Sequence, residues 1–187
     1  MYLYQPCLLS MALYEWAFCG SHMKYRWIWL LLPPAILAVS ELELTGMSIC
    51  VYPAGLLFPL LFLLDGMCAG GPADVLAASI LGGMLCWKAA DAWPLFPLIQ
   101  AVCAVLLLGT ATLLCRDRAK RSLACALGGL FFELFFCLRE YTLFSFCVIR
   151  LGSRESLSLG AASVCMYRLL EQVRFALRQK EKKQYSF

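Results

Sequence analysis

One acidic residue, Glu133, stands in the middle of the apolar run GGLFFELFFCLREY (128–141), and Arg139 and Glu140 follow it. If this run crosses a bilayer, a charged group facing lipid at its centre costs about 2.5–3.5 kcal/mol or more, so Glu133 must face a helix contact or a polar cavity. We therefore take Glu133, Arg139 and Glu140 as a candidate intramembrane polar site. We predict that Glu133 is buried between helices and is either protonated or hydrogen-bonded to a partner.

The remaining ionisable and nucleophilic residues do not form a recognisable reaction centre. His22 is the only histidine, and the sequence contains no metalloprotease, serine-hydrolase or phosphate-binding motif. The eleven cysteines are never closer than ten residues apart, and most lie in apolar runs, where cysteine behaves as a small apolar residue. We expect no catalytic, cofactor-binding or metal-binding residues, no cofactor, and a protein that is not an enzyme.

Small residues four apart predict where helices approach each other closely. Gly128 and Gly129 lie one turn before Glu133, and Gly82 and Gly83 form a similar pair earlier in the chain. Small residues at such spacing let two helix backbones pack in direct contact. These four glycines are the predicted helix-packing residues, and a glycine contact one turn away would explain how Glu133 is tolerated.

Composition indicates the environment of these residues. The chain has 187 residues, of which 62% are hydrophobic and 15% are charged, and its mean hydropathy is +0.75. Soluble domains are about 45–50% apolar and about 25% charged. The basic residues behind the net charge of +4 are scattered or terminal, which argues against nucleic acid as a partner. We predict an all-α, polytopic transmembrane helical bundle whose partners are the lipid bilayer and other membrane proteins.

Apolar runs place the expected helices. A spanning helix needs about 20 apolar residues, and the sequence offers about seven candidates, with six as the alternative. The candidates are 3–19, 27–40, 46–64, 75–87, 94–115, 122–138 and 157–177. Residues 141–150 are apolar but short, so that they prolong the sixth helix, re-enter the membrane or lie at its surface. Residues 1–178 then form a single transmembrane domain, and 179–187 form a basic polar tail.

The distribution of basic residues predicts the orientation. Four basic residues lie in RDRAKR (116–121) and five lie between Arg174 and the C-terminus. Because basic residues are enriched in cytoplasmic segments, this pattern favours an external N-terminus and a cytoplasmic C-terminus in the cell membrane.

Four segments define the layout of the chain: YLYQPCLLSMALYEW near the N-terminus, the basic junction CRDRAKR, the segment GGLFFE, and RLGSRESLSLGAAS before the last helix. This layout resembles the small YphA-type multi-pass membrane proteins of Gram-positive bacteria. The resemblance implies a bacterial membrane protein and adds no catalytic residue.

Two hypotheses of function follow. The first is a non-enzymatic structural or accessory membrane protein, which rests on the packing glycines and the missing catalytic motifs. The second is a small-solute transporter or the substrate-binding membrane subunit of one. It rests on Glu133 and on the prolines Pro33, Pro34, Pro53 and Pro59, because proline-interrupted membrane helices can line a cavity.

Overall fold

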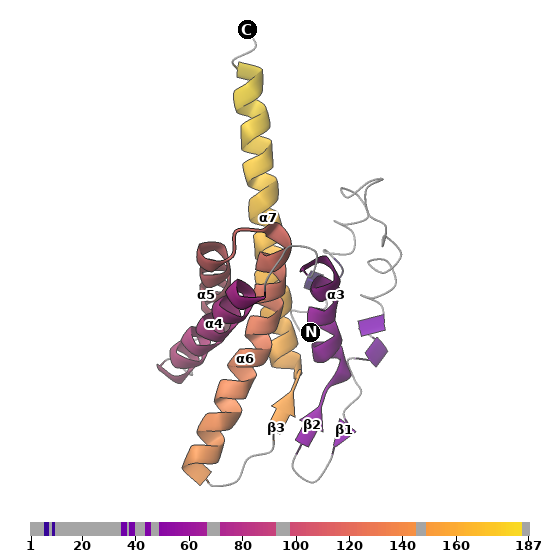
Figure 1. Cartoon of the computed structure of the whole chain (residues 1–187), viewed down its shortest axis with the longest axis vertical. Coiled ribbons are helices and arrows are strands. Elements are labelled where there is room, and N and C mark those ends of the chain that lie inside the picture. Colours follow the sequence, from indigo (N-terminus) through magenta and orange to yellow (C-terminus); the bar gives the residue numbers. More distant parts are fainter. Residues whose placement is uncertain are drawn as a thin grey trace.

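A computed structural model gives the fold as an elongated helical bundle with a small sheet at one end (Figure 1). It describes residues 49–66, 72–92, 98–144 and 149–184, together with the short pieces 6–7, 9, 35–36, 38–39 and 44–45. The described elements are β1 (Leu44–Thr45), β2 (Ile49–Val51), α3 (Pro53–Gly66), α4 (Ala73–Ala92), α5 (Ile99–Leu114), α6 (Arg118–Phe144), β3 (Ile149–Leu151) and α7 (Arg154–Gln184).

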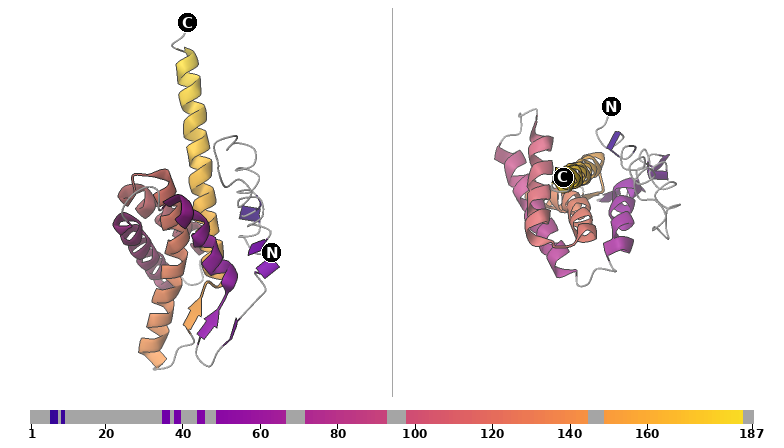
Figure 2. Two further views of the ribbon diagram at one scale, coloured as in Figure 1. Left: turned by 45° about the vertical axis from the view of Figure 1, so that its right-hand side comes forward. Right: turned by 90° about the horizontal axis from the view of Figure 1, so that it is seen from above.

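Helix α6 is the centre of the bundle and contacts each of the other four helices. Helices α4 and α6 run parallel, because Asp74 pairs with Lys120 near their first residues and Asp91 pairs with Arg139 near their last. Helix α5 runs in the opposite direction and returns the chain from the end of α4 to the start of α6. Helix α7 is antiparallel to α6. The second half of α7 projects well beyond the bundle (Figures 1 and 2).

The glycine pairs lie at the closest helix contacts. A Cβ added at Gly83 would lie 2.8 Å from the backbone nitrogen of Phe132 in α6, and one at Gly82 would lie 2.6 Å from Oγ1 of Thr110 in α5. Gly128 abuts the side chain of Leu107, and Gly129 abuts the carbonyl of Ser156 in α7. All four predicted packing glycines therefore face a neighbouring helix at a distance that leaves little room for a side chain.

The prediction of about seven transmembrane helices, and its alternative of six, is wrong. The described part of the chain holds five helices, and two of them, Ala73–Ala92 and Arg118–Leu143, are long and apolar enough to cross a membrane. Helix α3 has only 14 residues and α5 has 16. Helix α7 has 31 residues but is charged along much of its length. The predicted spans 3–19 and 27–40 and the predicted external N-terminus fall almost entirely outside the described residues.

One strand replaces the start of the predicted helix 46–64, and another takes the last residues of the segment 141–150. Residues 49–51 pair in parallel with 149–151, in the register Ile49 with Ile149, and antiparallel with β1. Proline lacks a backbone N–H and crowds the preceding turn, so Pro53 begins α3 instead of continuing a helix from residue 46. Of the segment 141–150, residues 141–144 prolong α6, whereas residues 149–150 belong to β3.

The ends of the last two helices also differ from the prediction. Helix α6 begins at Arg118, so most of the basic junction is helical rather than a loop. Helix α7 begins at Arg154, and the Ser153 side chain caps it by accepting a hydrogen bond from the Ser156 N–H. It continues to Gln184, so residues 179–184 of the predicted polar tail are helical.

Candidate functional site

Glu133 is buried, with 7% of its surface exposed, and its carboxylate meets the start of α7. Oε2 accepts hydrogen bonds from the backbone N–H groups of Gly152 at 2.8 Å and Ser153 at 3.2 Å. The first N–H groups of a helix have no partner within the helix, and they carry partial positive charge. The burial agrees with the prediction, but the hydrogen-bond donors belong to a turn backbone and not to the side of another helix.

The backbone turn that supplies these donors depends on glycine. Gly152 has a φ of +78°, a backbone conformation that residues other than glycine rarely adopt. A Cβ at this position would lie 2.7 Å from the carbonyl oxygen of Tyr52. Gly55 packs directly on Gly152 from α3, while Gly129 brings α6 against the first turn of α7. The glycines thus bring three backbones together around the Glu133 carboxylate.

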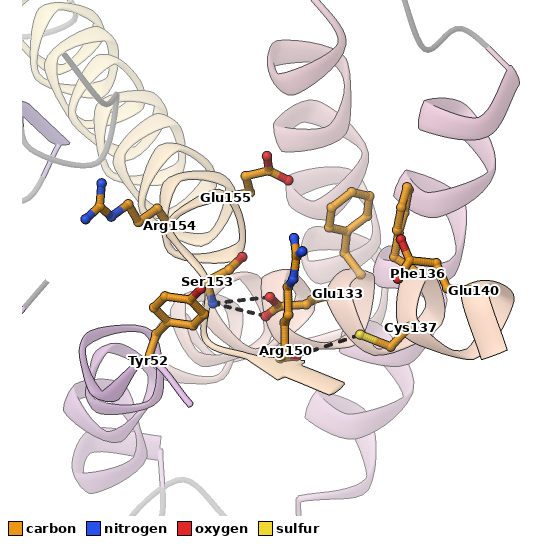
Figure 3. A pocket seen from close by; sticks show the side chains of 10 residues that line it. Tyr52, Glu133, Phe136, Cys137, Glu140, Arg150, Ser153, Arg154 and Glu155 are labelled. Atoms are coloured by element: carbon orange, nitrogen blue, oxygen red, sulfur yellow. Dashed lines mark hydrogen bonds between the residues drawn. The ribbon is translucent and has the colours of Figure 1, made fainter. Parts of the chain in front are cut away.

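A cavity of about 440 Å³ opens beside this carboxylate (Figure 3). That volume lies in the range of about 300–1,000 Å³ that is typical of small-molecule sites. Its walls come from α6, β3, the start of α7 and the residue before α3. The lining residues are Tyr52, Phe132, Glu133, Phe136, Cys137, Glu140, Arg150, Ser153, Arg154 and Glu155.

The three predicted polar residues do not form one cluster. Glu140 lines the cavity with Glu133, two helical turns further along α6. Arg139 instead forms a 2.7 Å ion pair with Asp91 at the end of α4, and its guanidinium lies 5.9 Å from the ring centre of Phe136. Arg139 therefore fastens α4 to α6, while Glu133 and Glu140 face the cavity.

Arg139, Asp91 and Glu140 form a polar layer near the end of α6, and a second polar layer lies near its start. The largely buried Lys120 ammonium lies 3.6 Å from Asp74 and 3.9 Å from Asp117. In α7, the carboxylate of Glu171 accepts a 2.7 Å hydrogen bond from the Tyr167 hydroxyl and forms a 3.1 Å ion pair with Arg118. The bundle thus has charged groups at both ends and few between them.

The charged residues at the two ends of the bundle form two rims. The basic rim contains Asp74, Arg116, Asp117, Arg118, Lys120, Arg121, Arg168 and Glu171. The mixed rim contains Lys88, Asp91, Arg139, Glu140, Arg150, Arg154 and Glu155.

Several residues of the cavity were not predicted. The sequence pattern assigned no site role to Arg150, Ser153 or Glu155, and it placed Tyr52 inside the predicted helix 46–64. The one sequence signal was RLGSRES (150–156), where a glycine and a serine precede an acidic residue and mark a helix start. Nothing in the sequence spacing indicates that this turn, 19 residues away, supplies the partner of Glu133.

The described cysteines form no disulfide, and the described residues contain no group of three or more His, Cys, Asp or Glu side chains that could hold a metal ion. Some of these thiols support helix contacts: the Cys86 thiol donates to the Cys103 carbonyl at 3.2 Å, and the Cys103 thiol donates to the Cys86 carbonyl at 3.6 Å. Comparison of the chain with protein-family models, curated proteins and solved structures found no match.

Proposed function

We propose that this chain is an integral membrane protein with a non-enzymatic, structural or accessory role, and that α4 and α6 cross the bilayer. The observation that carries the proposal is the apolar face of α4 that no other described element covers. Its exposed side chains are Leu76, Ile80, Leu81, Met84 and Leu85. Contiguous exposed apolar surface is unusual on soluble monomers and matches a surface that faces lipid.

The spacing of the two rims supports the same arrangement. Asp74 and Asp91 are 17 residues apart on α4, and Arg121 and Arg139 are 18 residues apart on α6. At 1.5 Å per residue these separations are about 26 and about 27 Å, close to the roughly 30 Å hydrocarbon thickness of a bilayer. Because α4 and α6 are parallel, the chain must return across the same layer from the end of α4 to the start of α6. In this arrangement α5 makes that return with 16 residues, fewer than the usual length of about 20, and the protein is multi-pass.

The charge difference between the rims supports a cytoplasmic C-terminus. The basic rim carries five basic and three acidic residues, and the projecting half of α7 adds Arg174 and Arg178 beyond it. The mixed rim carries four basic and three acidic residues. Because Lys and Arg are enriched in cytoplasmic segments, this difference supports a cytoplasmic basic rim and C-terminus. The YphA-like resemblance points to the same location, the bacterial cell membrane.

Photo-crosslinking tests the lipid-facing surface. A photoreactive residue in place of Met84, which is 39% exposed, is expected to form lipid adducts in membranes. The same residue in place of Ala78, which is 1% exposed, is the matched control and should crosslink within the protein. Release of the chain by alkaline carbonate, with no lipid adduct at position 84, would refute the membrane assignment.

The second candidate function is solute binding, as a small transporter or as the substrate-binding membrane subunit of one. The cavity beside Glu133 favours it, because a charged, aromatic-lined cavity at a membrane edge is more than helix packing requires. Reconstituted protein that takes up no solute from a broad panel, and binds none, would favour the purely structural role.

A further inference from the structure

Two neighbouring cavities share one wall. The second cavity measures about 290 Å³ and is lined by Ala90, Ile99, Gln100, Cys103, Phe132, Phe136, Glu155 and Leu159. Phe132, Phe136 and Glu155 also line the first cavity. The charged chamber beside Glu133 thus adjoins a mainly apolar chamber among α4, α5, α6 and α7, with Glu155 at their common boundary.

Two opposite charges in this space are available to a ligand. Glu133 already accepts hydrogen bonds from backbone N–H groups. Arg150 and Glu155 are exposed and make no ion pair with any described residue. In Figure 3 the Arg150 side chain extends toward the side where Glu155 lies, whereas the Arg154 side chain points away from both.

Each of these groups selects a different part of a ligand. The planar guanidinium of Arg150 matches a carboxylate or phosphate through two parallel hydrogen bonds. The Glu155 carboxylate matches an ammonium group, and the rings of Phe132 and Phe136 beside it can add a cation–π contribution. The chamber lined by Ile99, Cys103 and Leu159 matches an apolar arm.

We propose that the paired cavities bind a small zwitterion that carries an apolar arm. Its anionic group binds Arg150, its ammonium group binds Glu155, and its apolar arm enters the second chamber. A free apolar amino acid and the ethanolamine headgroup of a phospholipid both have this chemistry. The inference rests on the solute-binding candidate function but does not require transport.

Binding measurements on the purified full-length chain in detergent test the proposal with three related probes. L-Phenylalanine has both charges, phenethylamine lacks the carboxylate, and 3-phenylpropanoate lacks the ammonium group. We expect L-phenylalanine to bind at least tenfold more tightly than either analogue in calorimetry. Equal affinity for L-phenylalanine and phenethylamine, or equal affinity for L-phenylalanine and 3-phenylpropanoate, would overturn the proposal.

Two variants test which residue binds the carboxylate of the ligand and which binds its ammonium group. Arg150→Gln is expected to reduce L-phenylalanine binding at least tenfold and to leave phenethylamine binding unchanged. Glu155→Gln should have the converse effect, weakening L-phenylalanine and leaving 3-phenylpropanoate unchanged. Arg178→Gln, on the projecting half of α7, is the control and should change neither. Circular dichroism confirms that each variant is folded, and loss of all probes together in a folded variant would contradict the assignment.

A competition experiment identifies the source of the zwitterion. Short-chain phosphatidylethanolamine that displaces L-phenylalanine, with no displacement by phosphatidylglycerol, assigns a lipid headgroup. L-Phenylalanine binding that phosphatidylethanolamine does not displace assigns a free amino acid. Failure of both L-phenylalanine and phosphatidylethanolamine to bind overturns the inference. Uptake into proteoliposomes is measured separately, so that binding without uptake supports the zwitterion site and refutes only transport.

Discussion

At the scale of single residues, Glu133 has a structural partner that accounts for its position in an apolar helix. Its carboxylate bonds the backbone N–H groups of Gly152 and Ser153 just before α7 begins. Those groups would otherwise be buried without a partner, and an unsatisfied buried donor costs about 1–3 kcal/mol. An acid in the middle of α6 therefore stabilises the start of another helix, whatever further role the cavity has.

Replacement of Glu133 tests this account. Glu133→Gln keeps one oxygen acceptor but loses the negative charge, and we expect it to lower the free energy of unfolding by about 1–3 kcal/mol. Glu133→Lys should fail to accumulate, because it places a cation against the positive end of α7. Thermal unfolding in detergent, followed by circular dichroism, measures the first variant. Glu140→Gln, two turns along the same helix, is the control and should have a smaller effect; equal effects would contradict the account.

The phenol of Tyr167 provides a pH-dependent prediction. Burial, and then the hydrogen bond to Glu171, raise the pKa of Tyr167 to about 12. An unfolded tyrosine titrates near pH 10, so the neutral phenol contributes stability that is present below about pH 10 and is lost as the pH rises through about 12. Tyr167→Phe should remove a late-titrating phenol from the absorbance at 295 nm and should make the alkaline loss of stability shallower.

The matched control for this prediction is Tyr141→Phe, because Tyr141 is 61% exposed. That variant should leave the late-titrating phase in place, because the contact between the Tyr167 hydroxyl and Glu171 is unchanged. A late phase that survives in Tyr167→Phe would mean that the Tyr167 hydroxyl is not held in the buried contact with Glu171.

At the scale of elements, the four packing glycines determine how closely the helices approach one another. Gly82 and Gly83 place α4 against α5 and α6, while Gly128 and Gly129 place α6 against α5 and α7. An ion pair joins α4 to α6 at each end of their contact: Asp74 pairs with Lys120, and Asp91 pairs with Arg139. Close backbone contact in the middle and ion pairs at the ends together hold α4 and α6 in register.

Alanine substitutions separate packing from helix propensity. Gly83→Ala and Gly129→Ala should each destabilise the bundle by about 1–3 kcal/mol, because the added methyl overlaps the neighbouring backbone. Gly109→Ala is the control, since nothing lies within 4 Å of its Cβ position. It should stabilise the bundle by about 0.5–1 kcal/mol, the usual gain of alanine over glycine within a helix. Three effects of the same sign in thermal unfolding would contradict the packing assignment.

At the scale of the whole molecule, the two charged rims bound an apolar layer, and the projecting half of α7 extends beyond the basic rim (Figure 1). The mixed rim carries the sheet, the cavity and the ends of α4 and α6. In the proposed orientation, with the basic rim in the cytoplasm, the cavity would open on the external side of the membrane.

Reporter fusions test this orientation. Alkaline phosphatase fused after Ala92 should be active, because α4 ends at the mixed rim. Phosphatase fused after Arg116 or after the last residue should be inactive, and green fluorescent protein at those two sites should be fluorescent. An active phosphatase at the C-terminus would reverse the proposed orientation and place the cavity in the cytoplasm.

The sequence alone determined the features that depend on neighbouring residues. Apolar runs predicted most of α4, α5 and α6, and glycine spacing indicated Gly83 and Gly129 as packing positions, because helix periodicity and small side chains are local properties. It also predicted that Glu133 is buried, since its neighbours are all apolar.

Only the tertiary structure decided what surrounds Glu133 and how many helices are long and apolar enough to cross a membrane. Residues 49–51 became a strand because 149–151 pair with them, and Ser153 became the cap of α7 beside the carboxylate of Glu133. The paired strands lie 100 residues apart in the sequence, and Glu133 lies 19 and 20 residues before Gly152 and Ser153. Helix-like apolar runs therefore could not show where strand pairing and backbone turns would interrupt them.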